Sequence, residues 1–196
     1  MNDSSICHVN LAGGFRGGER QTFLLMKELA SRGHEQRLIA KANSALAANA
    51  KLIEGLEVIE SSLNGFDCRT YFKDAPLLHF HESRVFAAIW SFGIAAEKKH
   101  IITRRVERPP RSNFISKSIY SNANQTVTLS RAISKSIQKS FNLNLDPIVI
   151  PSAKTRFTTD QVEVQRIRSK IRGDFIVGHI GALDDSHKGQ LQIIEL

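Results

Sequence analysis

Short apolar runs alternate with amphipathic stretches along most of this chain. Residues 6–11 form a compact apolar run, residues 19–32 carry apolar side chains at helical spacing, and residues 36–40 form a second run. This order predicts a strand, a helix and a second strand parallel to the first. The same reasoning predicts further strands at 57–60, 77–80, 101–103, 126–129 (with Tyr120 just before it) and 148–150, and helices at 43–52, 85–96 and 130–141.

A second and shorter α/β pattern follows. Residues 162–171 are amphipathic, 175–180 are apolar as in a strand, and 189–196 begin a helix. One strand and one partial helix cannot bury a core. The prediction is an α/β fold: a Rossmann-like parallel sheet flanked by helices over residues 1–155, a linker or helix over 156–173, and the incomplete start of a second Rossmann-like domain over 174–196.

The composition indicates the class of protein and its cellular compartment. The chain has 41% hydrophobic and 23% charged residues, which is typical of a globular protein. Cys7 and Cys68 do not make a disulfide framework, which favours a reducing compartment. No segment reaches the about 18 apolar residues of a membrane span, and the N-terminus lacks the basic start of a signal peptide. We therefore expect a cytoplasmic protein or one peripheral on the inner membrane.

The charge pattern favours anionic partners. The formal net charge is +8, and much of the excess lies between Lys98 and Lys117, where Glu107 is the single acid. Nucleotides, phosphorylated glycolipids, an acidic membrane face and nucleic acid all fit this charge. Aromatic residues are not interleaved with the basic run, and no RRM or KH motif is present, so nucleic acid is the least favoured of these partners.

A glycine-rich loop follows the first predicted strand. Residues 13–18 read GGFRGG, and the helix that follows would direct its N-terminus at any anion in the loop. The spacing matches neither a Walker loop nor a dinucleotide fingerprint. A phosphate-binding loop and a simple glycine turn therefore both remain open.

Two histidines mark the end of the predicted strand 77–80. Strand alternation places His79 and His81 on one side, at the carboxyl end where α/β sheets bind ligands. With Glu82 they could suggest a metal, but no third ligand stands at a familiar spacing, so we expect none. Ordinary polar residues at a strand terminus are the alternative.

Three basic residues also stand near the ends of predicted strands. Arg104 and Arg105 follow strand 101–103, and their guanidinium groups match phosphate oxygens, although a solvated basic loop is the alternative. Lys188 would lie at the start of a helix, where a lysine can neutralise a diphosphate leaving group.

Taken together, these segments resemble one family. GGFRGGERQTFLLMKELASRGHEQRLI resembles the opening of group 1 (family 4) glycosyltransferases, which are retaining enzymes of the GT-B fold. LLHFHES, TVTLSRAISKSI and IVIPSAKTRF are similar to later segments of that family, and FIVGHIGALDDSHKGQLQII resembles the start of its C-terminal domain. The resemblance covers nearly the whole chain in the family's order.

The resemblance implies a function. It implies transfer of a sugar from a nucleoside-diphosphate sugar to a cell-envelope glycan or glycolipid such as lipopolysaccharide, without cofactor or metal. Gly17, Gly18 and Lys188 would contact the donor diphosphate, and the candidates on the acceptor or phosphate side are Glu19, His79, His81, Arg104 and Arg105. No single residue emerges as the catalytic group.

Two alternatives stay beside this hypothesis. The acidic donor motif of the family lies downstream of the Lys-Gly segment, and the sequence to Leu196 does not contain it. A truncated, inactive remnant is therefore the first alternative, and a basic nucleic-acid-binding module is a distant second.

Overall fold

The computed structural model describes residues 5–62, 70–83, 85–153, 158–173, 175–181 and 189–195. The chain divides into two units, Met1–Lys154 and Thr155–Leu196, and each is described by itself. Among the described residues, no helix combines the length and apolarity that crossing a bilayer requires.

The first unit is built on a parallel sheet in the strand order β3-β2-β1-β4-β5-β6-β7. Its elements are β1 (Ile6–Asn10), α1 (Gly17–Ser31), β2 (Gln36–Ala40), α2 (Ala45–Ala50), β3 (Leu56–Glu60), β4 (Leu77–Phe80), α4 (Phe86–Ser91), α5 (Ile94–Glu97), β5 (His100–Arg104), α6 (Phe114–Asn122), β6 (Gln125–Thr128), α7 (Arg131–Phe141) and β7 (Ile148–Val149). The order reverses direction after β3, because β4 pairs with the other edge of β1. This confirms the predicted Rossmann-like α/β fold.

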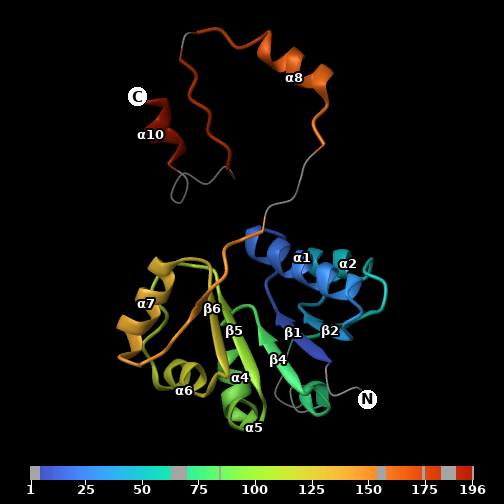
Figure 1. The fold of residues 1–196 in the computed structure, drawn as a ribbon, viewed down its shortest axis with the longest axis vertical. Helices are drawn as coiled ribbons and strands as arrows, with labels where there is room; N and C mark the ends of the chain where they lie inside the picture. The colour runs from blue at the N-terminus through green and yellow to red at the C-terminus, as the bar shows by residue number, and fades with distance from the viewer. Residues whose placement is uncertain are drawn as a thin grey trace. The chain divides into compact units, whose positions relative to one another are not determined.

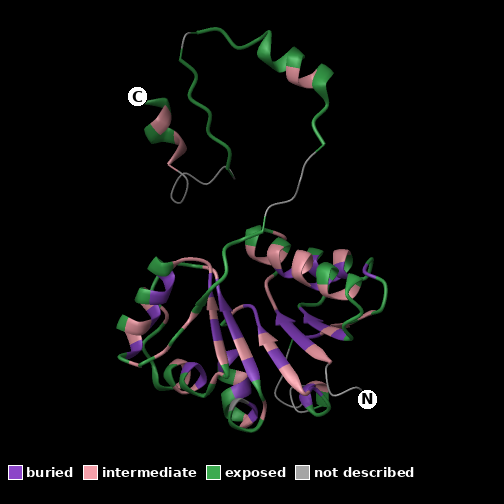
Figure 2. Cartoon of the chain, viewed as in Figure 1, coloured by how far each residue is buried: buried purple, intermediate pink, exposed green. Residues whose placement is uncertain are grey.

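Helices cover both faces of this sheet (Figure 1). Helices α1 and α2 pack into one cluster, and the helices that follow β4 pack into the other, as expected for right-handed crossovers. Each face has its own core: Met26 and Leu38 belong to one cluster, and Phe80, Ile89 and Tyr120 belong to the other. The strands between them are among the most buried parts of the chain (Figure 2).

Local capping explains where several helices begin. Ser130 precedes α7 and accepts a hydrogen bond from the Ile133 amide at 3.3 Å, which caps the helix expected at 130–141. Ser44 precedes α2 and accepts from the Ala47 amide at 3.2 Å. Gly33, with φ of 78°, follows the last turn of α1 and lets the chain turn into β2.

Two expectations in the first unit were wrong. The single helix expected at 85–96 is divided into α4 and α5, because Gly93 takes a left-handed conformation with φ of 70°. Tyr120 was grouped with a strand but lies in α6, where Asn113 accepts from the Ser116 amide and begins the helix. Ile119 and Tyr120 are the buried residues of that helix.

The second unit contains α8 (Gln161–Arg168) and α10 (Gln190–Ile194). The helix expected from residue 189 is confirmed, and the stretch expected as a linker or helix contains α8. Neither helix has a buried residue. The strand expected at 175–180 is absent from the described structure, where this segment is irregular and exposed. A strand needs a neighbour for its backbone hydrogen bonds, and the described residues of this unit provide none.

Candidate functional site

The candidate site lies at the carboxyl edge of β1, β4 and β5, where the strand order reverses. In open α/β sheets this edge is where ligands bind. The loop after β1 brings residues 13–18 to it, the end of β4 brings His79 and His81, and the end of β5 brings Arg105.

A hydrogen bond between Arg16 and Glu19 holds the end of the glycine loop against the first turn of α1. The Arg16 amide donates to the Glu19 carboxylate at 2.8 Å, which satisfies one of the free amides that every helix start leaves. Glu19 thus has a structural role as a helix cap. Its position also places a carboxylate near the Arg105 guanidinium.

The fold itself does not require glycine in this loop. None of Gly13, Gly14, Gly17 and Gly18 has a positive φ. A Cβ added at Gly17 would meet nothing within 4 Å, and one at Gly18 would meet only Arg105 Cδ at 3.8 Å, an ordinary contact. Backbone strain and crowding therefore do not explain these glycines, which leave the loop amides open to close approach by a ligand.

Replacing Gly17 or Gly18 with alanine separates these explanations. We expect each variant to keep or raise the free energy of unfolding, by up to about 1 kcal/mol, because alanine favours a helix over glycine. Binding of a phosphate-bearing ligand should weaken, since the new methyl group covers the amides. Urea unfolding measures the first effect and ligand titration the second. A loss of stability above about 1 kcal/mol would instead identify the loop as a structural turn.

Three histidines, one more than the sequence suggested, gather beneath this loop. His8 of β1 lies beside His79 in the strand register, and the ring centroids of His79 and His81 are 4.0 Å apart. His8 and His81 are buried and His79 is half-buried. The predicted same-side placement of His79 and His81 is therefore confirmed.

The donor and the acceptor of each hydrogen bond in this cluster follow from Arg105, which can only donate. The Arg105 Nη2 group lies 3.0 Å from His81 Nδ1 and can only donate, so His81 carries its proton on Nε2. His81 Nε2 then donates to His8 Nδ1 at 3.0 Å, and His8 Nε2 donates to Gln36 Oε1 at 3.1 Å. Gln36 donates in turn to the Met26 carbonyl at 3.0 Å, which ends the chain.

Burial keeps these imidazoles neutral. It lowers the pKa of His8 to about 4, and it holds the pKa of His79 and His81 well below the usual value of 6.5. Neighbouring histidines and the Arg105 charge lower the pKa of His79 and His81 further. The cluster therefore offers fixed dipoles rather than positive charges at neutral pH.

The same cluster has the composition of a metal site. One nitrogen of each histidine lies within 4.8 Å of the others. His8 supplies the third nitrogen, and the sequence spacing did not reveal it because His8 lies 73 positions before His81. The hydrogen bonds argue against a metal, because a ligating imidazole needs an acceptor at its other nitrogen, whereas His81 Nδ1 faces a guanidinium donor. We therefore interpret the cluster as a hydrogen-bonded support for Arg105.

Arg105 is the cation of this site. Two of its five N–H groups face His81, at 3.0 Å to Nδ1 and 3.3 Å to the carbonyl oxygen, and its buried Nε has no hydrogen-bond partner. Burial lowers its pKa to about 10, although the Glu19 charge opposes that shift, so it stays charged at pH 7. A half-buried guanidinium with unused donors is suited to an oxyanion.

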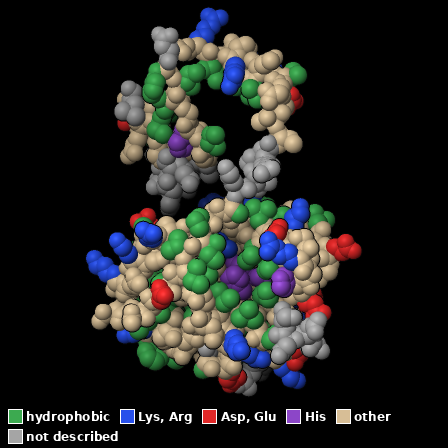
Figure 3. All heavy atoms as spheres, viewed as in Figure 1, with side chains coloured by type: hydrophobic (Ala, Val, Ile, Leu, Met, Phe, Trp, Pro, Cys, Tyr) green, Lys and Arg blue, Asp and Glu red, His purple; other side chains and the backbone are tan. Residues whose placement is uncertain are grey.

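A cavity of about 400 Å³ adjoins this arginine. Its wall is mostly apolar, and a few polar groups converge on it, as is typical of ligand pockets. His79 Nε2 lies 2.7 Å from Thr103 Oγ1 on this wall. Figure 3 shows histidine among hydrophobic side chains on this face of the first unit. The lining residues are Gln21, Leu24, Leu25, Glu28, His79, Ile101, Thr103, Arg105, Val127, Leu129, Ile150, Pro151 and Ala153.

The structure brings together most of the predicted site residues. Gly17, Gly18, Glu19, His81 and Arg105 lie around one edge, with His79 on the cavity wall. Arg104 does not join them, because successive strand residues point to opposite faces. It lines a different cavity, on the face of α4 and α6. Lys188 lies outside the described residues.

Sequence reasoning missed His8, Gln36 and Thr103. A histidine inside the apolar run 6–11 was the available signal for His8, since a fully buried histidine needs partners. The partners themselves follow only from the pairing of β1 with β4, which local sequence does not specify.

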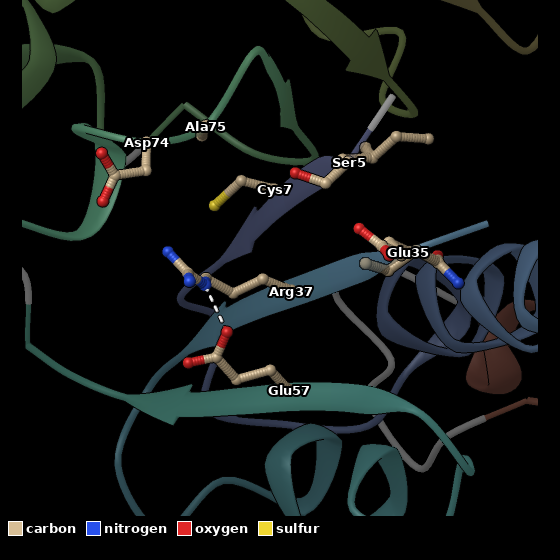
Figure 4. A pocket seen from close by; sticks show the side chains of 9 residues that line it. Ser5, Cys7, Glu35, Arg37, Glu57, Asp74 and Ala75 are labelled. Carbon is tan, nitrogen blue, oxygen red and sulfur yellow. Dashed lines mark hydrogen bonds and ion pairs between the residues drawn. The ribbon is translucent and has the colours of Figure 1, made fainter. Parts of the chain in front are cut away.

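A second hollow lies at the amino end of the strands, around Cys7 (Figure 4). Its volume is about 150 Å³, and the Arg37 and Glu57 side chains form an ion pair of 2.6 Å beside the thiol. Burial raises the pKa of Cys7 to about 12, although the Arg37 charge opposes this. The buried thiol is thus protonated at neutral pH, and the thiolate that would react is scarce.

Alkylation checks this assignment. In a Cys68→Ser variant, Cys7 should react with iodoacetamide at pH 8 at least about a thousandfold more slowly in the folded chain than in urea, since the thiolate is the reactive form. Mass spectrometry of the Cys7 peptide measures both rates. Rapid labelling of the folded chain would contradict a buried, protonated thiol.

Solved structures of other proteins share this fold. A parallel sheet in this order, with helices on both faces, defines a Rossmann-like fold, and the solved structures that match it include GT-B glycosyltransferases. Anabaena HepE in complex with UDP-glucose matches with a TM-score of 0.74 and 13% identity, over 98% of this chain and 56% of that one.

Two further structures share the fold. A glycosyltransferase from Rickettsia africae matches with a TM-score of 0.62 and 19% identity, over 89% of this chain and 51% of that one. Acinetobacter baumannii MurG matches with a TM-score of 0.56 and 11% identity, over 98% and 57%. This chain thus spans about half the length of these proteins. Neither a family model nor a curated protein matches its sequence.

Proposed function

We propose that this chain is a retaining, family 4 glycosyltransferase that moves a sugar from a nucleoside-diphosphate sugar to a cell-envelope glycan such as lipopolysaccharide, with residues 1–155 on the acceptor side. One observation carries the proposal. Glycines that the fold does not require stand beside Arg105, an arginine with unused donors, at the ligand-binding edge of a fold shared with glycosyltransferases.

The proposed roles follow from position. The Gly17 and Gly18 amides would approach the donor diphosphate, and Arg105 would hydrogen-bond to its oxygens. When the bond from sugar to phosphate breaks, the diphosphate leaves with the electron pair, and a fixed cation lowers the energy of that developing charge. Lys188 would act on the same diphosphate, as the family resemblance implies.

The acceptor would enter beside the apolar cavity. His79 and Thr103 offer polar contacts at its wall, and α1 and β6 supply apolar ones. An acceptor with sugar hydroxyls and an apolar part fits this lining. The donor class is supported by HepE, a protein of the same fold that was solved with UDP-glucose. The basic stretch between Lys98 and Lys117 would also attract the chain to the anionic face of the inner membrane as a peripheral protein.

The test is a transfer assay on the protein. It is incubated with UDP-glucose and other nucleotide sugars, with lipopolysaccharide core as acceptor, and both UDP release and the mass of the acceptor are measured. We expect UDP release that depends on the acceptor, and a product that NMR shows to have the donor's anomeric configuration. Absence of both nucleotide-sugar binding and transfer across the set would refute it.

A further inference from the structure

A third cavity lies at the carboxyl end of β5, on the opposite face of the sheet from Arg105. Its volume is about 550 Å³, and the loop after β5 and the helices α4 and α6 form its wall. Three arginines contribute to the wall, and the described lining contains no Asp or Glu. The polar lining includes Arg104, Arg108, Arg111, Asn113, Ser116 and Tyr120.

Arg104 is the buried cation of this cavity. It is 9% exposed, and its Nε is buried without a hydrogen-bond partner. Its Nη2 group donates to the Arg108 carbonyl. None of the ion pairs between described residues includes Arg104. A buried charge without a counter-ion is costly, and a bound anion would remove that cost.

The loop that carries the other two arginines is held in place. Ser136 donates to the Glu107 carbonyl and Ser112 donates to the Ser140 carbonyl, each at 3.0 Å, so both ends of the loop are tied to α7. Pro109 and Pro110 restrict the backbone between them. Binding to a preformed loop loses less conformational entropy than binding to a mobile one.

The helix α6 directs its N-terminus at the same cavity. Asn113 caps it by accepting from the Ser116 amide at 2.8 Å, and no acidic residue occupies its first turn. Helix N-termini favour negative charge because of their free amides and the helix dipole. The dipole and the three arginines therefore act in the same direction.

We infer that this cavity binds a phosphoryl group, either on a soluble ligand or in a lipid headgroup. Arginine forks match phosphate oxygens, and several cations without a nearby carboxylate suit a dianion. The site lies on the opposite face from the proposed donor contacts, so its occupancy does not depend on sugar transfer. The proposed function and this inference can therefore fail separately.

The test is a titration of the chain with inorganic phosphate, followed by backbone amide NMR. We expect saturable shifts at Ser116 and the loop from Val106 to Asn113. Arg108→Gln and Arg111→Gln, both at exposed positions, should each weaken binding about tenfold, which is about 1.4 kcal/mol. Lys27→Gln on α1 removes one charge from the other face and should leave the affinity unchanged.

A second arm distinguishes the two sources. Vesicles of phosphatidylcholine with phosphatidic acid are sedimented with the wild-type chain and with both arginine variants. Capture that requires Arg108 and Arg111 identifies a lipid headgroup, whereas binding of free phosphate alone identifies a soluble ligand. Failure of the chain to bind either probe would overturn the inference, as would an equal loss of affinity in the Lys27→Gln variant.

Discussion

Replacing Arg105 with alanine is expected to weaken the binding of UDP-glucose about 10- to 100-fold. A hydrogen bond to a charged group contributes about 1.5–3 kcal/mol, and each 1.4 kcal/mol is tenfold in affinity. Arg105 is the charged group that meets both the glycine loop and the histidine cluster. Isothermal titration of the chain with UDP-glucose measures the change.

Two further variants control this experiment. Arg105→Lys keeps the charge but loses the planar fork that reaches His81 Nδ1 and the His81 carbonyl together, so its affinity should lie between wild type and Arg105→Ala. Lys27→Ala removes an exposed charge from α1 and should have no effect. If Arg105→Ala binds as wild type does, Arg105 has no role in donor binding.

The stability of the fold should fall steeply as the pH drops below 6.5. The pKa of His8, His79 and His81 is lowered in the folded state, so the unfolded chain binds more protons below pH 6.5 and stability decreases as pH falls. Below pH 6.5, each histidine that the fold holds neutral lowers the free energy of unfolding by about 1.4 kcal/mol per pH unit. For His8 the loss continues down to a pH of about 4.

Urea unfolding between pH 4.5 and 7.5 measures this slope. A His8→Gln variant should be less stable at pH 7, because it breaks the hydrogen-bonded chain from His81 to Gln36. Its stability should also change less with pH, because one of the three titrating histidines is gone. The exposed His34 is the matched control, and His34→Gln should keep the full slope. Equal slopes in wild type and His8→Gln would mean that His8 titrates alike in the folded and unfolded chain.

The sequence predicted the strands well because most are short apolar runs bounded by turns. Residues 77–80 were placed at the observed bounds of β4, and β5 is only one residue longer at each end than expected. The helix α6 was missed because its serines and β-branched residues do not favour a helix, and the Asn113 cap and the burial of Ile119 and Tyr120 stabilise it.

The candidate site was predictable only in part. Glycines before a helix and histidines after a strand indicate ligand binding by their local chemistry. The division of Arg104 and Arg105 between two faces depends on where β5 ends, and the link from His81 through His8 to Gln36 depends on which strands pair. Both depend on tertiary structure, which one short motif cannot specify.

We propose that the glycine loop and Arg105 bind the phosphates of a nucleotide sugar, and mapping UDP-glucose on the chain by amide NMR can decide this. We expect saturable shifts at Gly17, Gly18 and Arg105, which weaken in Arg105→Ala and persist in Lys27→Ala. Saturable shifts confined to the cavity of Arg104, or no shifts in either place, would contradict it.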